Sequence, residues 1–169
     1  LVNRYPVTPV KSSSQDRRLG AMGTQAATDR SFFTLPKVTM PKTLVDCGNC
    51  GPDFQAIRAM VEREFGARVL QSHGLDDTLA ILREHAIDLV TINRKLDQDY
   101  SDGLDVAKAI KASAEVSHVP VMLVTNYAEH QEAAISVGCA RGFGKLALGS
   151  PETHRLLRPF LGSEMPSGD

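Results

Sequence analysis

Short apolar runs alternate with amphipathic stretches along most of the chain from residue 43 onward. Short apolar runs occur at 43–45, 68–70, 87–93, 121–124 and, more weakly, 140–144. The run at 87–93 is the clearest, because it is rich in β-branched residues and a charged loop follows it directly. Such runs are typical of strands buried on both faces of a parallel sheet. We therefore predict five strands.

Helical periodicity fills the intervals between these runs. Phe54, Ile57, Val61 and Phe65 recur at helical spacing after Pro52. Further helices are expected from residue 76 or 77, over 103–112, over 128–137 and over 153–161. Proline removes a backbone donor and clashes inside a helix, so Pro159 predicts that the last helix is short or kinked.

Five strand–helix units in about 120 residues predict an α/β fold with a doubly wound parallel sheet. We expect the flavodoxin-like (βα)5 arrangement with strand order 2-1-3-4-5. The carboxyl ends of parallel strands share one edge of the sheet, where open α/β folds bind ligands. That edge would bring together Asp46, Asn93, Thr125 and Lys145, which end the first, third, fourth and fifth strands.

Differences in composition and charge along the sequence predict three regions. Residues 1–39 lack sustained periodicity and are expected to be a flexible extension, residues 40–161 a single domain, and residues 162–169 a disordered tail. The first 40 residues carry six Lys and Arg against two Asp, whereas the whole chain has a net charge of −1. The domain is therefore mildly acidic, which argues against nucleic acid as a partner.

The hydrophobic runs and the cysteine count indicate where in the cell the protein is expected. No apolar run approaches the length of a membrane span, so no membrane association is expected. The chain has three Cys, an odd number that argues against a secreted disulfide framework. We expect a cytoplasmic protein that is not an enzyme and has no cofactor.

The order of the edge residues resembles the receiver domain of two-component response regulators over residues 40–161. Three short segments add to the likeness: Asp102-Gly103-Leu104, Val119-Pro120-Val121 and Gly138-Cys139-Ala140. In that family two acids after strand one hold Mg²⁺, and an Asp that ends strand three accepts a phosphoryl group. A Thr and a Lys contact that group. The resemblance thus implies a fold and a phosphorylation pocket.

The chain departs from that family at the residues that perform the chemistry. Asn93 stands where the acceptor Asp is expected, and its amide is neither an anion nor a phosphate acceptor. Of the acid pair we assign only Asp46, with Cys47 in the second place, and a neutral thiol is a poor Mg²⁺ ligand. We expect no metal site, a Lys145–Asp46 ion pair and a locally hydrogen-bonded Thr125. The resemblance is thus to a degenerate receiver.

A Cys-x-x-Cys motif between the first strand and the first helix offers a different interpretation. Thiol pKa values fall near helix N-termini, so Cys47 and Cys50 are candidates for a redox pair. Two other interpretations are that both cysteines are inert loop residues, or that they are two of the four ligands of a zinc site.

The leading hypothesis is a phosphorylation-independent signalling or scaffolding module that acts by protein–protein interaction. The alternative is a thiol redox protein or sensor that uses Cys47 and Cys50. The protein partner and the oligomeric state are left open.

Overall fold

The computed structural model describes residues 40–162; the expected extension at 1–39 and the tail at 163–169 lie outside the described residues. Strands and helices alternate along the described chain. They are β1 (Thr43–Cys47), α1 (Gly51–Phe65), β2 (Arg68–Ser72), α2 (Leu75–Glu84), β3 (Leu89–Asn93), α3 (Gly103–Ala112), β4 (Val121–Val124), α4 (Ala128–Ser136), the 3-10 turn η1 (Lys145–Ala147) and α5 (Pro151–Leu161).

The sheet is parallel and has the strand order β2-β1-β3-β4, which confirms the predicted fold class and the order of the first four strands. Every residue of β1 and β4 is buried, as the unbroken apolar runs predicted. Leu44 pairs with Leu89 and Cys47 pairs with Ile92. This register decides which side chains meet at the carboxyl edge.

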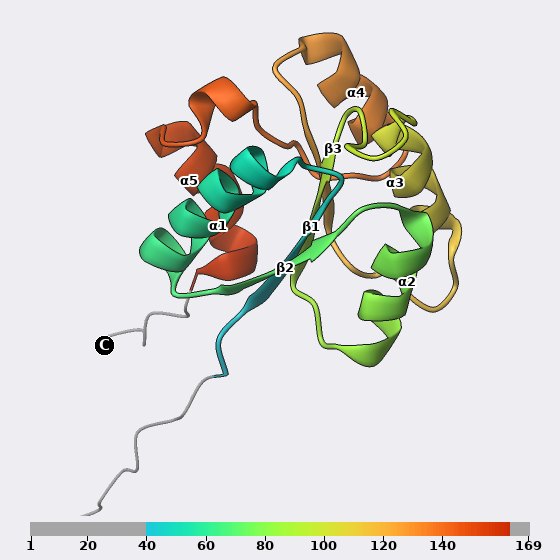
Figure 1. The fold of residues 1–169 in the computed structure, drawn as a ribbon, viewed down its shortest axis with the longest axis horizontal. Helices are drawn as coiled ribbons and strands as arrows, with labels where there is room; N and C mark the ends of the chain where they lie inside the picture. Colours follow the sequence, from blue (N-terminus) through green and yellow to red (C-terminus); the bar gives the residue numbers. More distant parts are fainter. Residues whose placement is uncertain (1–39, 163–169) are drawn as a thin grey trace, which may run out of the picture. The chain divides into compact units, whose positions relative to one another are not determined.

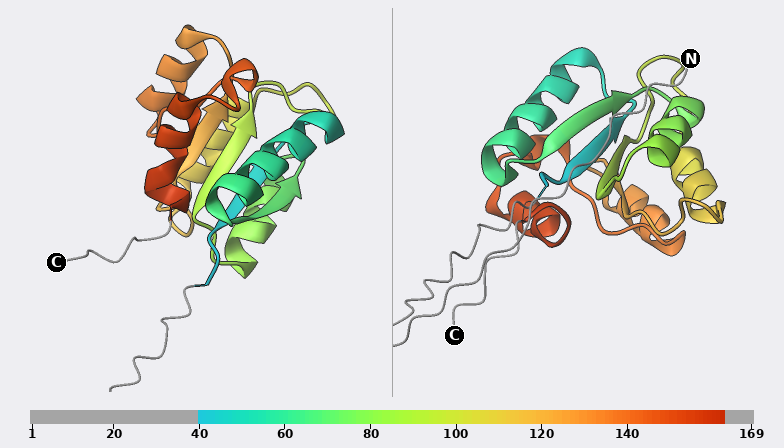
Figure 2. Two further views of the ribbon diagram at one scale, coloured as in Figure 1. Left: turned by 90° about the vertical axis from the view of Figure 1, so that its left-hand side faces the viewer. Right: turned by 90° about the horizontal axis from the view of Figure 1, so that it is seen from below.

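Helices cover both faces of the sheet. In Figures 1 and 2, α1 and α5 lie on one face, and α2, α3 and α4 lie on the other. Successive side chains of a strand point to opposite faces of the sheet. Leu44 and Leu89 therefore pack with α1 and α5, whereas Val45 and Val90 pack with α2, α3 and α4. The core therefore consists of two apolar layers, one on each face of the sheet.

The predicted fifth strand at 140–144 is wrong as a regular strand. This segment runs beside β4, but its only ladder contact is the isolated parallel bridge between Met122 and Ala140. Backbone hydrogen bonds close it at each end, from Ala140 N to Val121 O (2.9 Å) and from Thr125 N to Phe143 O (3.0 Å).

A buried side chain makes hydrogen bonds to β4 and to this segment where a regular ladder is absent. Gln131 of α4 donates from Nε2 to the carbonyl oxygens of Leu123 (3.1 Å) and Thr125 (3.2 Å), and its Oε1 accepts from Gly142 N (2.9 Å). Gly142 comes so close to β4 that a Cβ there would lie 2.0 Å from Leu123 O. The segment is thus attached by backbone hydrogen bonds at its two ends and by this amide between them, rather than by a regular ladder.

The expected interruption of the last helix at Pro159 is also wrong. Helix α5 continues through Pro159 to Leu161. The proline removes only its own N–H, and only two helical residues follow it before α5 ends at Leu161. Ser150 caps the start of the helix by accepting from Thr153 N (3.2 Å), and Pro151 occupies the first turn.

Among residues 40–162, no helix has the length and apolar character that a membrane crossing requires.

Candidate functional site

Asn93 ends β3 at the carboxyl edge of the sheet, as predicted. Its Nδ2 donates to the carbonyl oxygens of Gly48 (3.0 Å) and Lys95 (2.5 Å). Both N–H groups of the amide are therefore used to connect the loop after β1 with the loop after β3. A carboxylate at this position would have no hydrogen to donate to either carbonyl.

The loop after β3 is closed by its own contacts. Asp102 caps α3 by accepting from Leu104 N (2.9 Å) and pairs with Arg94 (2.7 Å). Gly103 N donates to Arg94 O (3.0 Å), and a Cβ on Gly103 would lie 2.0 Å from Asn93 O. Only glycine allows α3 to begin this close to the end of β3.

The loop after β1 packs directly on the loop after β3. Gly48 has a positive φ of 71°, and a Cβ there would lie 2.3 Å from Leu96 Cδ2. Leu96 is buried beneath it. Cys47 pairs with Ile92. The residues of the loop after β1 that lie next to Asn93 are therefore Gly48 and Asn49.

Asp46 lies within β1 and not at the open edge, contrary to the expected placement. It is fully buried, and its Oδ1 accepts from Asn49 Nδ2 (2.9 Å) and Thr91 Oγ1 (2.8 Å). Burial raises the pKa of Asp46 to about 6, although both hydrogen bonds and, less strongly, the charge of Lys145 act in the opposite direction.

The expected Lys145–Asp46 ion pair is wrong. Lys145 Nζ lies 2.6 Å from Asp53 Oδ2, in the first turn of α1, and this bond lowers the pKa of Asp53. The first turn of α1 comes closer to η1 than β1 does, so the half-exposed carboxylate of Asp53 meets the lysine first. An acid in the first turn of a helix was visible in the sequence, but a partner 92 residues away was not.

Thr125, just after β4, makes local hydrogen bonds. Its Oγ1 accepts from Tyr127 N (3.3 Å) and lies 3.3 Å from His130 Nδ1. Together with Asn93 and Lys145, these residues border an open hollow of about 380 Å³. The edge thus brings Asn93, Thr125 and Lys145 around one space, while Asp46 stays behind it.

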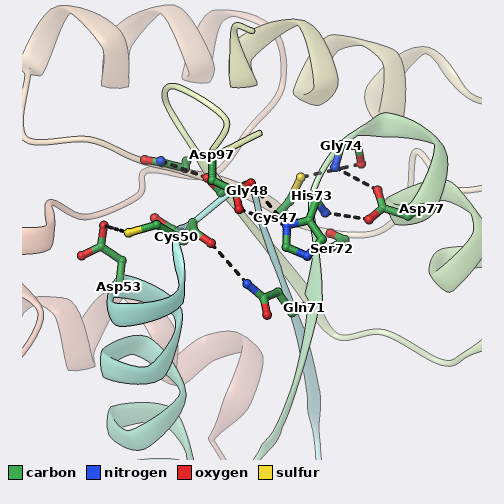
Figure 3. Close-up of polar contacts among 12 residues, drawn as sticks. Cys47, Gly48, Cys50, Asp53, Gln71, Ser72, His73, Gly74, Asp77 and Asp97 are labelled. Atoms are coloured by element: carbon green, nitrogen blue, oxygen red, sulfur yellow. Dashed lines mark hydrogen bonds and ion pairs between the residues drawn. The ribbon is translucent and has the colours of Figure 1, made fainter. Parts of the chain in front are cut away.

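The two thiols of the Cys-x-x-Cys motif have different surroundings. Cys47 is buried and its Sγ lies 3.8 Å from Gly74 O, whereas Cys50 is exposed and donates to Asp53 Oδ2 (3.4 Å). Figure 3 shows the two sulfur atoms directed to opposite sides of the loop. Burial also raises the pKa of Cys47. A nucleophilic thiolate needs the opposite shift and an accessible sulfur, so Cys47 lacks the features of a reactive thiol.

The residues at this edge do not fit the Mg²⁺ ion that the family resemblance implies. Mg²⁺ favours several oxygen ligands in octahedral geometry, usually with carboxylates among them. Neither Cys47 nor the following Gly48 and Asn49 supplies a carboxylate, and Asp46 Oδ1 already accepts two hydrogen bonds. Within residues 40–162, no group of three His, Cys, Asp or Glu side chains is placed to hold a metal.

Comparison with known proteins identifies relatives of this chain. No protein-family model matches the sequence. The polar-differentiation response regulator DivK of Brucella anthropi is 26% identical over 124 residues, which cover 73% of this chain and 98% of DivK. Sequence and fold together support homology to response regulator receiver domains.

Solved receiver structures have the same fold. The receiver protein from Pseudomonas putida superposes with a TM-score of 0.58 at 18% identity, covering 72% of this chain and 98% of that one. The chemotaxis response regulator CheY4 of Vibrio cholerae gives a TM-score of 0.55 at 14% identity, covering 70% and 100%. The receiver fold places the site described above at the edge where its strands end.

Several residues that shape the edge were missed at the level of sequence. Asn49 holds Asp46, Gln131 attaches the segment at 140–144, and His73 Nδ1 lies 3.1 Å from Asp97 Oδ2 across two loops. Asn49 lies between the two cysteines of the Cys-x-x-Cys motif, and that spacing does not signal a bond to Asp46. Nothing in the spacing of Gln131 or His73 signals these contacts.

Proposed function

We propose that this protein is a receiver-like signalling or scaffolding module that binds another protein and is not regulated by phosphorylation at Asn93. The observation that carries the proposal is the bonding of Asn93, whose amide donates to Gly48 O and Lys95 O. Phosphoryl transfer to a receiver needs a carboxylate nucleophile, which an amide does not provide. The amide instead ties the two edge loops together in one arrangement.

The surroundings of Asn93 support the same proposal. Lys145, the lysine of the pocket, is engaged by Asp53 at 2.6 Å and not by a group at the end of β3. Thr125 bonds to neighbours in its own loop. The groups that would sense a phosphoryl group thus have other partners.

An exposed apolar surface supports a protein as the ligand. Leu146 is 92% exposed and Tyr127 is 62% exposed. Both border an open hollow of about 450 Å³ whose lining comes from α4, residues 141–144 and α5. Large exposed apolar side chains beside a hollow are typical of interaction sites. We propose that this surface, defined by Tyr127, Leu146 and the hollow, contacts the partner.

Two measurements test the proposal. Incubation with acetyl phosphate and Mg²⁺ should leave the intact mass unchanged; a stable adduct of one phosphoryl group would refute the claim about Asn93. Leu146→Glu should remove the proteins that copurify with the tagged chain from lysate, whereas Tyr100→Glu, at a residue that is 76% exposed in the loop after β3, should not. Equal capture by both variants would refute the surface.

A further inference from the structure

Two buried oxygen atoms near β1 have no hydrogen-bond donor. They are Asp46 Oδ2 and Asn49 Oδ1, and both residues are fully buried. The same two side chains are already joined by Asn49 Nδ2, which donates to Asp46 Oδ1 (2.9 Å). A buried acceptor without a donor destabilises the fold, so two of them on one bonded pair of side chains require an explanation.

One proton held between them would satisfy both atoms. A neutral carboxyl group has one O–H donor and one carbonyl acceptor, and a primary amide likewise has an N–H donor and a carbonyl acceptor. We propose that Asp46 and Asn49 form a buried proton-binding site, in which the protonated carboxylic acid of Asp46 makes a cyclic acid–amide pair with Asn49. In this pair Asp46 Oδ2–H donates to Asn49 Oδ1, while Asn49 Nδ2 donates to Asp46 Oδ1. The proton comes from solvent.

Burial of the pair favours the neutral acid. On β3, Thr91 Oγ1 donates to Asp46 Oδ1 (2.8 Å), which favours the charged form, but less strongly than desolvation favours the neutral one. The charged groups that act on Asp46 are Lys145 of η1 and Asp53 of α1, and they have opposite effects on its pKa. Because these two are bonded to each other at 2.6 Å, their fields at Asp46 partly cancel. Desolvation is then the dominant influence, and it favours the neutral form.

A cation is a poorer occupant than a proton. Two oxygens are far fewer than the six or more that Mg²⁺ or Ca²⁺ takes. A water molecule that donates to both oxygens would satisfy them without protonating Asp46, and the experiment below separates the two cases.

The site bears on the edge because of what Asn49 holds. Its backbone carbonyl accepts from Gln71 Nε2 (3.3 Å), and the preceding Gly48 carbonyl accepts from Asn93 (3.0 Å). Ionisation of Asp46 would break the Oδ2–H bond and weaken the restraint on this loop. Proton binding therefore regulates how firmly the edge loop is held, whether or not the proposed partner binding is correct.

The test uses infrared spectra of the full-length chain in D₂O across pH 4 to 8. We expect a protonated-carboxyl C=O band that titrates with a midpoint near 6, about two pH units above the ordinary value of 3.8. Asp46→Asn should remove this band, and Asp105→Asn, at an exposed acid on α3, should leave it. If the component with a midpoint near 6 survives in Asp46→Asn, or is absent from the wild-type protein, the proposal is refuted and the bridging water remains.

Two further measurements keep the test decisive. If Asp46→Asn does not fold, carbon-13 NMR of aspartate-labelled wild type should show one carboxyl carbon that titrates with a midpoint near 6. Adding MgCl₂ or KCl at constant ionic strength should not move that midpoint. A cation-dependent fall in the midpoint would assign the oxygens to a metal ion and overturn the assignment to a proton.

Discussion

Asn93→Asp is the most informative single change, because it replaces one atom and reverses its hydrogen-bonding role. The amide Nδ2 donates to Gly48 O at 3.0 Å and to Lys95 O at 2.5 Å. In the variant a carboxylate oxygen faces both carbonyl oxygens, so two hydrogen bonds become two repulsive contacts. At about 1 kcal/mol for each bond, the free energy of unfolding should fall by about 2 kcal/mol at pH 7.

The sign of the pH dependence follows from the same contacts. Protonation gives the new carboxyl group one O–H, which restores one of the two bonds. The pKa of that group should therefore be raised, and part of the lost stability should return as the pH falls. Urea unfolding at pH 7 and pH 5 measures both effects.

Asn126→Asp is the matched control. It makes the same chemical change in an exposed residue, but there the side-chain oxygen does the bonding, accepting from Leu146 N (3.3 Å). We expect the control to lose less than about 0.5 kcal/mol. If the two variants unfold at the same urea concentration, the Asn93 amide does not anchor the edge. Phosphorylation of Asn93→Asp by acetyl phosphate in Mg²⁺ would also show that the metal site is more intact than we describe.

Three further changes test the fold and the thiols. Gln131→Leu should lower the free energy of unfolding by about 3 kcal/mol, since it removes three buried hydrogen bonds, and chemical denaturation measures this. Gly103→Ala should lose about 1–3 kcal/mol through overpacking against Asn93 O, whereas Gly51→Ala, where a Cβ meets nothing within 4 Å, should be nearly neutral. In the native protein a thiol reagent should modify the exposed Cys50 and spare the buried Cys47; mass spectrometry of the modified chain would contradict this by showing equal labelling.

The fold was predictable from the sequence because the spacing of apolar residues in each helix or strand indicates which of its faces is buried. Unbroken apolar runs identified the central strands, and helical spacing of Phe54, Ile57 and Val61 identified the buried face of α1. The weak run at 140–144 misled for a physical reason. The Gln131 side chain stands between the backbone of this run and β4 where a regular ladder would continue, and periodicity carries no information about a side chain from another element.

The candidate site was predictable only in part. The sequence by itself predicted that Asn93 and Thr125 share one edge, because parallel strands align their carboxyl ends. Lys145 reaches the same edge although the segment before it is not a regular strand. Only the tertiary structure decided that Asp46 is buried behind that edge with Asn49, and that Lys145 pairs with Asp53. The physical reason is that strand register and the approach of α1 to η1 set these distances. Both depend on how separate elements pack, whereas hydrophobic periodicity records only which face of each element is buried.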